Sequence, residues 1–345
     1  MKKLIYGLAA VAFAAMMVAC GGDTYKVGVT KGDKSKMDTL SYSFGISFAN
    51  DISYNIPEMK FDWATLIESA ETSMLVTEAY DKDEKVNESI KVLEEFFSVQ
   101  RPERIKKFLE ENKPDSVERL RPHEEHALLA QLDIFENEEE RKSVSEAYGY
   151  DLGARYRSIR IPFQAYWFAQ GVADHQIKSE PKMAGDEASN YLMTYQMNKL
   201  PKINKEASEA WLAKVEKKSG VKKTESGLLY LIEEEGDQNI KPTAKCRVKA
   251  NYEGKLRDGV VFDSSYERGE AIEFPLSGVI KGWTEGLQLI GKGGKITLWI
   301  PAELAYGESM AGMLGPNEAL EFKVELVDVI PAVENNAPVE AEEIE

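Results

Sequence analysis

The sequence predicts an α+β protein in which a helical N-terminal part is followed by a β-rich C-terminal part. Between Met37 and Gly220, long stretches lack both Pro and Gly, and apolar residues recur at helical spacing. From Val221 onward, Gly is frequent and apolar residues alternate with polar ones, which is the period of a strand. A chain of 345 residues is too long for one ordinary domain, so we expect several.

The composition is that of a globular, acidic protein. Hydrophobic residues make up 43% of the chain and charged residues 30%, which is enough apolar surface for real cores. The net charge is −16. Because binding to nucleic-acid backbones needs clustered Lys and Arg, this balance argues against nucleic acid as a partner.

The first residues predict export and lipidation. Lys2 and Lys3 precede an apolar run that ends at Ala19 and is too short to span a bilayer comfortably. A small residue before Cys20 resembles a bacterial lipobox, so we expect a signal peptide at 1–19, an acylated Cys20 and a tether over 20–36. The alternatives are an ordinary signal peptide or a buried helix. Gly21, where an Asp would favour the inner membrane, predicts an outer-membrane anchor, with the protein at the periplasmic face or exposed at the surface.

The helical part contains a faint internal repeat. The segment 41–49 can be laid over 145–153, and each is followed by a break at a Pro and a second amphipathic stretch. We expect one repeat at 37–100, a charged helical connector at 101–142, and a second repeat with a linker helix at 143–222. Generic aromatic-bearing helices are the alternative. Asn204 is predicted to be the N-cap of the linker helix, and the acidic tail at 332–345 is predicted to be disordered.

The C-terminal part shows three half-buried strands and one short helix. Alternation over 246–252, 296–300 and 322–326 predicts strands of an antiparallel sheet. A helix that starts at Gly282 places Trp283 and Leu287 four residues apart, on the face toward that sheet. Cys246 belongs to one alternating run, so it is predicted to be a core thiol rather than a reactive one.

Several short motifs in this part resemble the FKBP-type peptidyl-prolyl cis-trans isomerases, in family order and near family spacing. The motifs are Tyr252-Glu253-Gly254, Asp258-Gly259 with Val261–Ser265, Val279–Trp283, Ala305-Tyr306-Gly307 and Phe322–Leu326. The resemblance implies that 223–331 is a twisted antiparallel sheet wrapped around a short helix. The helical part is similar to the N-terminal domain of Mip/FkpA-like FKBPs, envelope proteins that dimerise through that region.

The resemblance also implies a set of site residues. The catalytic ones would be Asp263, Tyr252, Tyr306 and Ile280, with the Ile280 N–H and the Tyr306 hydroxyl bonding substrate carbonyls. The walls and floor of the substrate pocket would be Phe262, Val279, Trp283, Phe322, Ile272 and Leu314. Two departures stand out: Ile272 stands where relatives often carry an aromatic residue, and Gly315 replaces a Pro in a loop that overhangs the site.

The function implied is isomerisation of Xaa-Pro bonds in the bacterial cell envelope, assisting the folding of exported proteins. Substrates would be proline-containing unfolded or nascent exported chains, and macrolide FKBP inhibitors would be ligands. No cofactor and no metal are expected, because rotation about an amide requires neither. The alternative is a chaperone whose helical body holds unfolded clients with little isomerase activity. The helical repeats predict either a homodimer or an intrachain pseudo-dimer.

Overall fold

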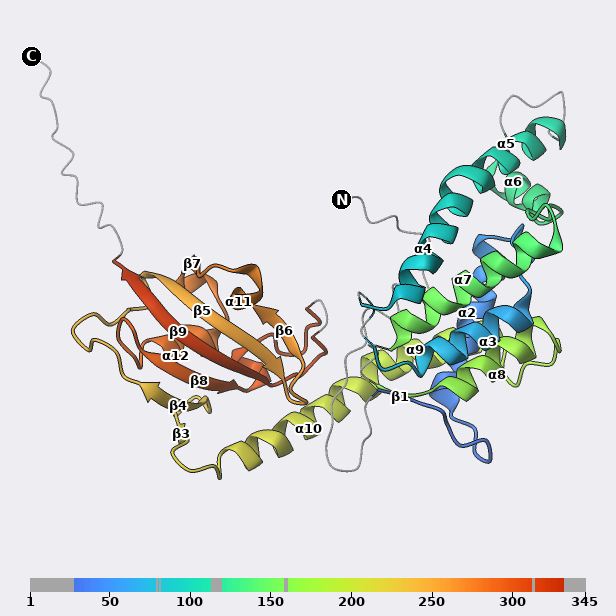
Figure 1. Ribbon diagram of the computed structural model, residues 1–345. Coiled ribbons are helices and arrows are strands. Elements are labelled where there is room, and N and C mark those ends of the chain that lie inside the picture. Colours follow the sequence, from blue (N-terminus) through green and yellow to red (C-terminus); the bar gives the residue numbers. More distant parts are fainter. Residues whose placement is uncertain are drawn as a thin grey trace, which may run out of the picture. The chain divides into compact units, whose positions relative to one another are not determined.

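The computed structural model describes residues 28–331 apart from 79, 81, 113–119, 158–160 and 312–313. Contacts divide the chain into a helical unit and a unit built on a β-sheet, with the main boundary after Pro201 (Figure 1). The α+β class is therefore confirmed. The predicted signal peptide, the acylated Cys20 and the acidic tail lie outside the described residues.

Before the sheet, the chain forms two series of helices that follow the same plan. The first series is α2 (Thr39–Asn55), α3 (Trp63–Met74), α4 (Glu84–Glu95), the π-helical turn η1 (Phe96–Gln100) and α5 (Arg101–Asn112). After α6 (Pro122–Leu129), the second series is α7 (Glu138–Tyr156), α8 (Ala165–Gln176), α9 (Gly185–Thr194), the π-helical turn η2 (Tyr195–Lys199) and α10 (Leu200–Val215). Asp or Asn N-cap residues fix the N-termini of α2, α3, α4 and α7. The side chains of Asp38, Asp62, Asp83 and Asn137 each accept a hydrogen bond from a backbone N–H of the first turn.

The two series pack crosswise, so that α2, α3 and α4 meet helices of the second series. Helix α2 lies against α8, and α3 lies against α7 (Figure 1). Two matching hydrogen bonds follow this plan: the Asp62 N–H donates to Ser145 Oγ at 2.9 Å, and the Gln164 N–H donates to Ser41 Oγ at 2.8 Å. The two halves of the unit are thus interlocked within one chain.

Both π-helical turns have the same cause. Each lies directly before a helix whose second residue is proline, Pro102 after η1 and Pro201 after η2. Proline has no N–H for the usual bond to the fourth preceding carbonyl, and its ring crowds that carbonyl. The turn widens in response: the Arg101 N–H bonds to Phe96 O and the Leu200 N–H to Tyr195 O, five residues back. Helices α5 and α10 therefore have matching positions: each ends its series and directly follows a π-helical turn.

The segment predicted as a tether is in part folded. Strand β1 (Gly28–Thr30) pairs in parallel with β2 (Pro162–Gln164). Just beyond it, the Trp167 indole N–H donates to Asp33 O at 2.8 Å. The expected tether over 20–36 is therefore wrong for its described end, because backbone and indole hydrogen bonds hold residues 28–33 on the helical unit.

The second unit is a seven-stranded antiparallel sheet. Its order is β3-β4-β8-β9-β5-β6, and β7 also pairs with β5. The strands are β3 (Lys222–Lys223), β4 (Leu229–Glu234), β5 (Arg247–Leu256), β6 (Val261–Ser264), β7 (Ile272–Pro275), β8 (Lys295–Ile300) and β9 (Leu320–Ile330). The short helices are α11 (Ser265–Arg268), η3 (Leu276–Gly278), α12 (Lys281–Leu287) and η4 (Ala302–Leu304). The three predicted strands are confirmed as β5, β8 and β9, but β8 is buried on both faces rather than half-buried.

Helix α12 packs closely against the sheet, which curves around it (Figure 1). A Cβ on Gly282 would lie 2.5 Å from the Ile300 side chain, so only glycine permits this approach to β8. The close packing sets Trp283, 5% exposed, between the helix and the sheet, and buries Leu287 completely. Both residues face the sheet, as the sequence predicts.

The linker helix α10 differs from the expectation in where it begins and in the unit to which it belongs. Asn204 is not an N-cap, because α10 begins at Leu200 directly after η2 and Asn204 lies in its second turn. Residues 202–311 belong to the unit of the sheet. There Val215 packs in a cluster with Leu229 and Trp299. Helix α10 thus ends the second series of helices and, from Lys202 onward, packs in the sheet unit.

Candidate functional site

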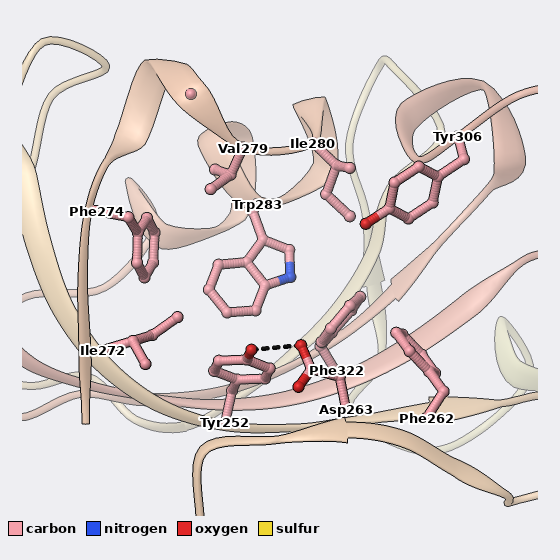
Figure 2. A pocket seen from close by; sticks show the side chains of 11 residues that line it. Tyr252, Phe262, Asp263, Ile272, Phe274, Val279, Ile280, Trp283, Tyr306 and Phe322 are labelled. Carbon is pink, nitrogen blue, oxygen red and sulfur yellow. Dashed lines mark hydrogen bonds between the residues drawn. The ribbon is translucent and has the colours of Figure 1, made fainter. Parts of the chain in front are cut away.

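A pocket of about 450 Å³ opens between α12 and the concave side of the sheet (Figure 2). Nine of the predicted residues line it: Tyr252, Phe262, Asp263, Ile272, Val279, Ile280, Trp283, Tyr306 and Phe322. Phe274 and Gly278 complete the lining. The residues come from strands β5, β6, β7 and β9, from the start of α12 and from the turn after η4, so distant parts of the chain converge on one site.

The floor of the pocket is the indole of Trp283. Its ring meets Tyr252 at 5.0 Å and Phe322 at 5.1 Å between centroids, both nearly perpendicular. Phe274 closes a further side at 5.4 Å. Edge-to-face contacts of this kind favour one arrangement of the rings beyond their burial alone. The result is a preformed aromatic box that faces the opening (Figure 2).

One carboxylate, Asp263, lies at the rim of this box. It accepts a hydrogen bond from the Tyr252 hydroxyl and is ion-paired with Arg268, whose second nitrogen donates to Tyr252 Oη at 2.7 Å. Burial alone would raise the pKa of Asp263, but the hydrogen bonds from Tyr252 and Arg268 outweigh burial and lower the pKa. Burial, together with Asp263, raises the pKa of Tyr252 to about 12. At neutral pH the pair is therefore a carboxylate and a neutral phenol.

Besides Phe274 and Gly278, the sequence reasoning missed Arg268, which contacts the site carboxylate from outside the lining. A local signal for it exists: Ser264 and Glu267 have the spacing of a capping box, and Gly269 follows with φ +80°. The Ser264 side chain indeed accepts a hydrogen bond from the Glu267 N–H. This pattern predicts a single helical turn, and such a turn brings Arg268 back beside Asp263.

The remaining predicted residues lie at the opening and beyond it. Ile280 is the N-cap residue of α12, and Tyr306, 43% exposed, points its hydroxyl toward Ile280 across the mouth (Figure 2). Leu314 was predicted to line the pocket but is not among its lining residues; it is buried, 4% exposed. Among the residues that the structure describes, no group of three or more His, Cys, Asp or Glu is placed to hold a metal ion.

Comparisons with known proteins bear on the family of the chain. A family model described as "FKBP-type peptidyl-prolyl cis-trans isomerase" matches residues 238–327, and one described as "Domain amino terminal to FKBP-type peptidyl-prolyl isomerase" matches 141–232. The FkpA isomerase of Aeromonas hydrophila is 39% identical over 211 residues, which are 55% of this chain and 78% of the relative. The Mip isomerase of Coxiella burnetii is 38% identical over 201 residues, 55% of this chain and 87% of the relative.

A crystal structure of FkpA from Escherichia coli is 39% identical and covers 50% of this chain and 84% of its own, with a TM-score of 0.39. The extent and identity of the sequence matches to the two relatives decide the classification. This chain belongs to the FKBP-type peptidyl-prolyl cis-trans isomerases and is an enzyme of that class.

Proposed function

We propose that this isomerase accelerates Xaa-Pro isomerisation in exported proteins, from a lipid anchor in the bacterial envelope. The observation that carries the catalytic part is the indole floor of a mostly apolar pocket, with Asp263 as the one charged residue in its lining. Uncatalysed Xaa-Pro isomerisation takes tens to hundreds of seconds, so an isomerase is useful while exported chains fold.

The pocket suits the chemistry of amide rotation. The barrier of about 18–20 kcal/mol arises from resonance, which makes the planar amide charge-separated and well solvated. The twisted transition state is less polar, so a box of Trp283, Phe322 and Tyr252 that excludes water disfavours the planar form relative to the twisted one. The Ile280 N–H and the Tyr306 hydroxyl would hold the carbonyls that flank the proline.

Asp263 would contribute a fixed charge at the rim. Its two hydrogen-bond donors, Tyr252 and Arg268, hold the carboxylate in place before substrate arrives, and a preorganised charge needs no rearrangement during the reaction. No nucleophile or proton transfer is part of this mechanism. The same apolar box would accept macrolide inhibitors of the class.

A protease-coupled assay with a proline peptide tests this assignment. Asp263→Asn keeps the shape of the side chain and removes its charge, so we expect kcat/KM to fall roughly tenfold to a hundredfold, below the largest losses seen for preorganised electrostatic groups. Asp328→Asn is the matched control. Asp328 lies on β9 outside the pocket and forms an ion pair with Lys292. Equal activity of the two variants would remove Asp263 from the mechanism.

The envelope location rests on the N-terminal sequence. In the part of the chain that the structure describes, every helix is too short or too polar to span a bilayer. The proposed anchor is acylated Cys20, since several acyl chains on one residue hold firmly at about 0.8 kcal/mol per buried CH2. Mass spectrometry of the purified chain should show acylation that Cys20→Ser abolishes; an unmodified Cys20 in the membrane fraction would contradict the proposal.

A chaperone role of the helical unit is the second candidate. Exposed apolar side chains on this unit motivate it: Met193 is 50% exposed, Met197 67% and Tyr54 70%. Methionine and aromatic side chains suit adaptable binding to varied unfolded clients. Suppression of aggregation should weaken in a Met193→Ser, Met197→Ser variant whose isomerase activity is intact. Unchanged suppression would argue that these residues do not hold clients.

A further inference from the structure

Helix α10 is joined to the sheet unit by a buried polar contact. Asn204 and Ser208 lie one turn apart on its inner face and are 0% and 4% exposed. The Asn204 side-chain amide donates to Pro316 O at 2.8 Å. The Ser208 hydroxyl donates to Asn317 O at 2.7 Å and accepts from the Ala319 N–H at 3.0 Å. Three backbone groups of the segment 316–319 are therefore held by two side chains of one helix.

A buried ion pair reinforces the same contact. Arg257, just after β5, pairs with Glu318 at 3.2 Å, and the two side chains are 1% and 2% exposed. Arg257 also donates to Asn204 O at 3.3 Å, which ties the pair to α10. Buried ion pairs are poor stabilisers compared with apolar packing, because both charges lose water. Their best-attested role is to specify one arrangement of the parts that they join.

The segment 316–319 is linked to the pocket in two ways: by a hydrogen bond of Asn317 and by strand β9, which follows it. Asn317 has a left-handed backbone, φ +57°, and its N–H donates to Gly307 O at 2.7 Å. Gly307 directly follows Tyr306, whose hydroxyl stands at the mouth of the pocket (Figure 2). At the other end, β9 begins at Leu320 and carries Phe322 into the lining. A hydrogen-bonded path thus runs from Ser208 through Asn317 to the turn that carries Tyr306.

We propose that Ser208 of α10, supported by Asn204 and Arg257, is a positioning residue of the isomerase. It fixes the segment 316–319 and thereby holds Tyr306 where its hydroxyl meets the substrate carbonyl. The residues 202–215 lie outside the segment that matches the catalytic family model, 238–327. In this chain the linker helix is therefore part of the enzyme's working structure, although it touches no substrate.

The test is a double-mutant cycle in the full chain, read by kcat/KM with a proline peptide. Ser208→Ala leaves Asn317 O and the Ala319 N–H without their partner, so we expect a loss of roughly tenfold, within the 10²-fold that a misplacement of about 1 Å can cost. Tyr306→Phe removes the hydroxyl that Ser208 positions. Because both changes act on one contact, the loss from Ser208→Ala should shrink to less than about twofold in the Tyr306→Phe background.

The Val215→Ala variant tests whether loosening of α10 alone lowers activity. Val215 lies on the same helix in the apolar cluster with Leu229 and Trp299, away from the segment 316–319. The Val215→Ala substitution should lower the melting temperature of the protein yet keep kcat/KM within about twofold of the unaltered protein. Ser208→Thr retains the hydroxyl and should recover most of the activity; if Ser208→Ala does not fold, Asn204→Ala enters the same cycle.

Two results would overturn the proposal. One is a full additive loss when Ser208→Ala is combined with Tyr306→Phe. The other is a Val215→Ala variant that loses as much activity as Ser208→Ala, since α10 would then act through stability alone. A failure of the proposed isomerase mechanism is recognised separately, because Tyr306→Phe and Asp263→Asn would then both be silent.

Discussion

At the scale of single residues, the Asp263–Arg268 pair makes a prediction about pH. The hydrogen bonds from Tyr252 and Arg268 keep the pKa of Asp263 below its ordinary value in spite of burial. The carboxylate therefore stays charged to lower pH than an ordinary aspartate, and activity should be flat around neutrality. Arg268→Leu removes one of the two donors and the positive charge, so protonation and the loss of kcat/KM should begin at higher pH.

The pH profile is measured between about pH 4 and 8, which brackets ordinary carboxylate titration. Arg247→Leu is the matched control, because Arg247 forms an exposed ion pair with Glu273 on the same sheet and does not line the pocket. Its acid limb should coincide with that of the unaltered protein. An Arg268→Leu variant whose acid limb does not move would show that Asp263 is not the group that titrates.

Much of the pocket was predictable from residue motifs, and the exceptions have physical reasons. Trp283, Phe262 and Phe322 belong to motifs of fixed spacing in regular elements, so their positions follow from the resemblance. Leu314 lies in a loop without periodicity, where similarity of sequence does not determine the direction of a side chain. Asn204 has the residue type of a cap, but its partner is 112 residues away, and no local pattern reveals such a contact.

At the scale of elements, the crosswise helix pairs depend on small residues. A Cβ on Gly149 of α7 would lie 2.2 Å from Leu66 O of α3, and a Cβ on Gly45 of α2 would lie 2.2 Å from Phe168 O of α8. Backbone oxygens cannot move aside as a flexible side chain can. Gly149→Ala and Gly45→Ala should therefore each destabilise the helical unit, by at least the 1–3 kcal/mol typical of overpacking.

Thermal unfolding of each variant checks this, with Ser143→Ala as the control because Ser143 is exposed on α7. In an ordinary helix, Gly→Ala would instead stabilise by roughly 1 kcal/mol. A raised melting temperature for both glycine variants would mean that the helices are not so close. Isomerase activity at low temperature should be unchanged, because the pocket lies in the other unit.

The elements themselves were predictable in proportion to their length and regularity. Strands β5, β8 and β9 alternate over six residues or more, and the alternation was visible in the sequence. Strands β6 and β7 have four residues each, too few to show a period. Strand β1 was taken for a tether because three residues that pair with a strand 134 positions away carry no local signal.

At the scale of the whole molecule, the repeated plan bears on assembly. Helices α2 and α7 occupy matching places in the two series, and each already has a partner, α8 and α3, within the same chain. The matching hydrogen bonds of Ser41 and Ser145 are likewise made within the chain. Pairing of two such helical series is therefore available within one chain.

This arrangement predicts that the chain from Gly21 onward is a monomer with one active site. The helix faces that would pair two subunits are buried by the chain's own repeats: Tyr42, Ile46 and Leu66 are completely inaccessible. Opening them for exchange with a second chain would expose apolar surface at about 25 cal/mol per Å², with no gain from re-forming the same contacts. Sedimentation equilibrium at micromolar concentration should therefore give the mass of one chain. A stable mass of two chains would show that another surface pairs the molecules, and Gly45→Ala, which weakens only the internal pairing, would then leave that dimer intact.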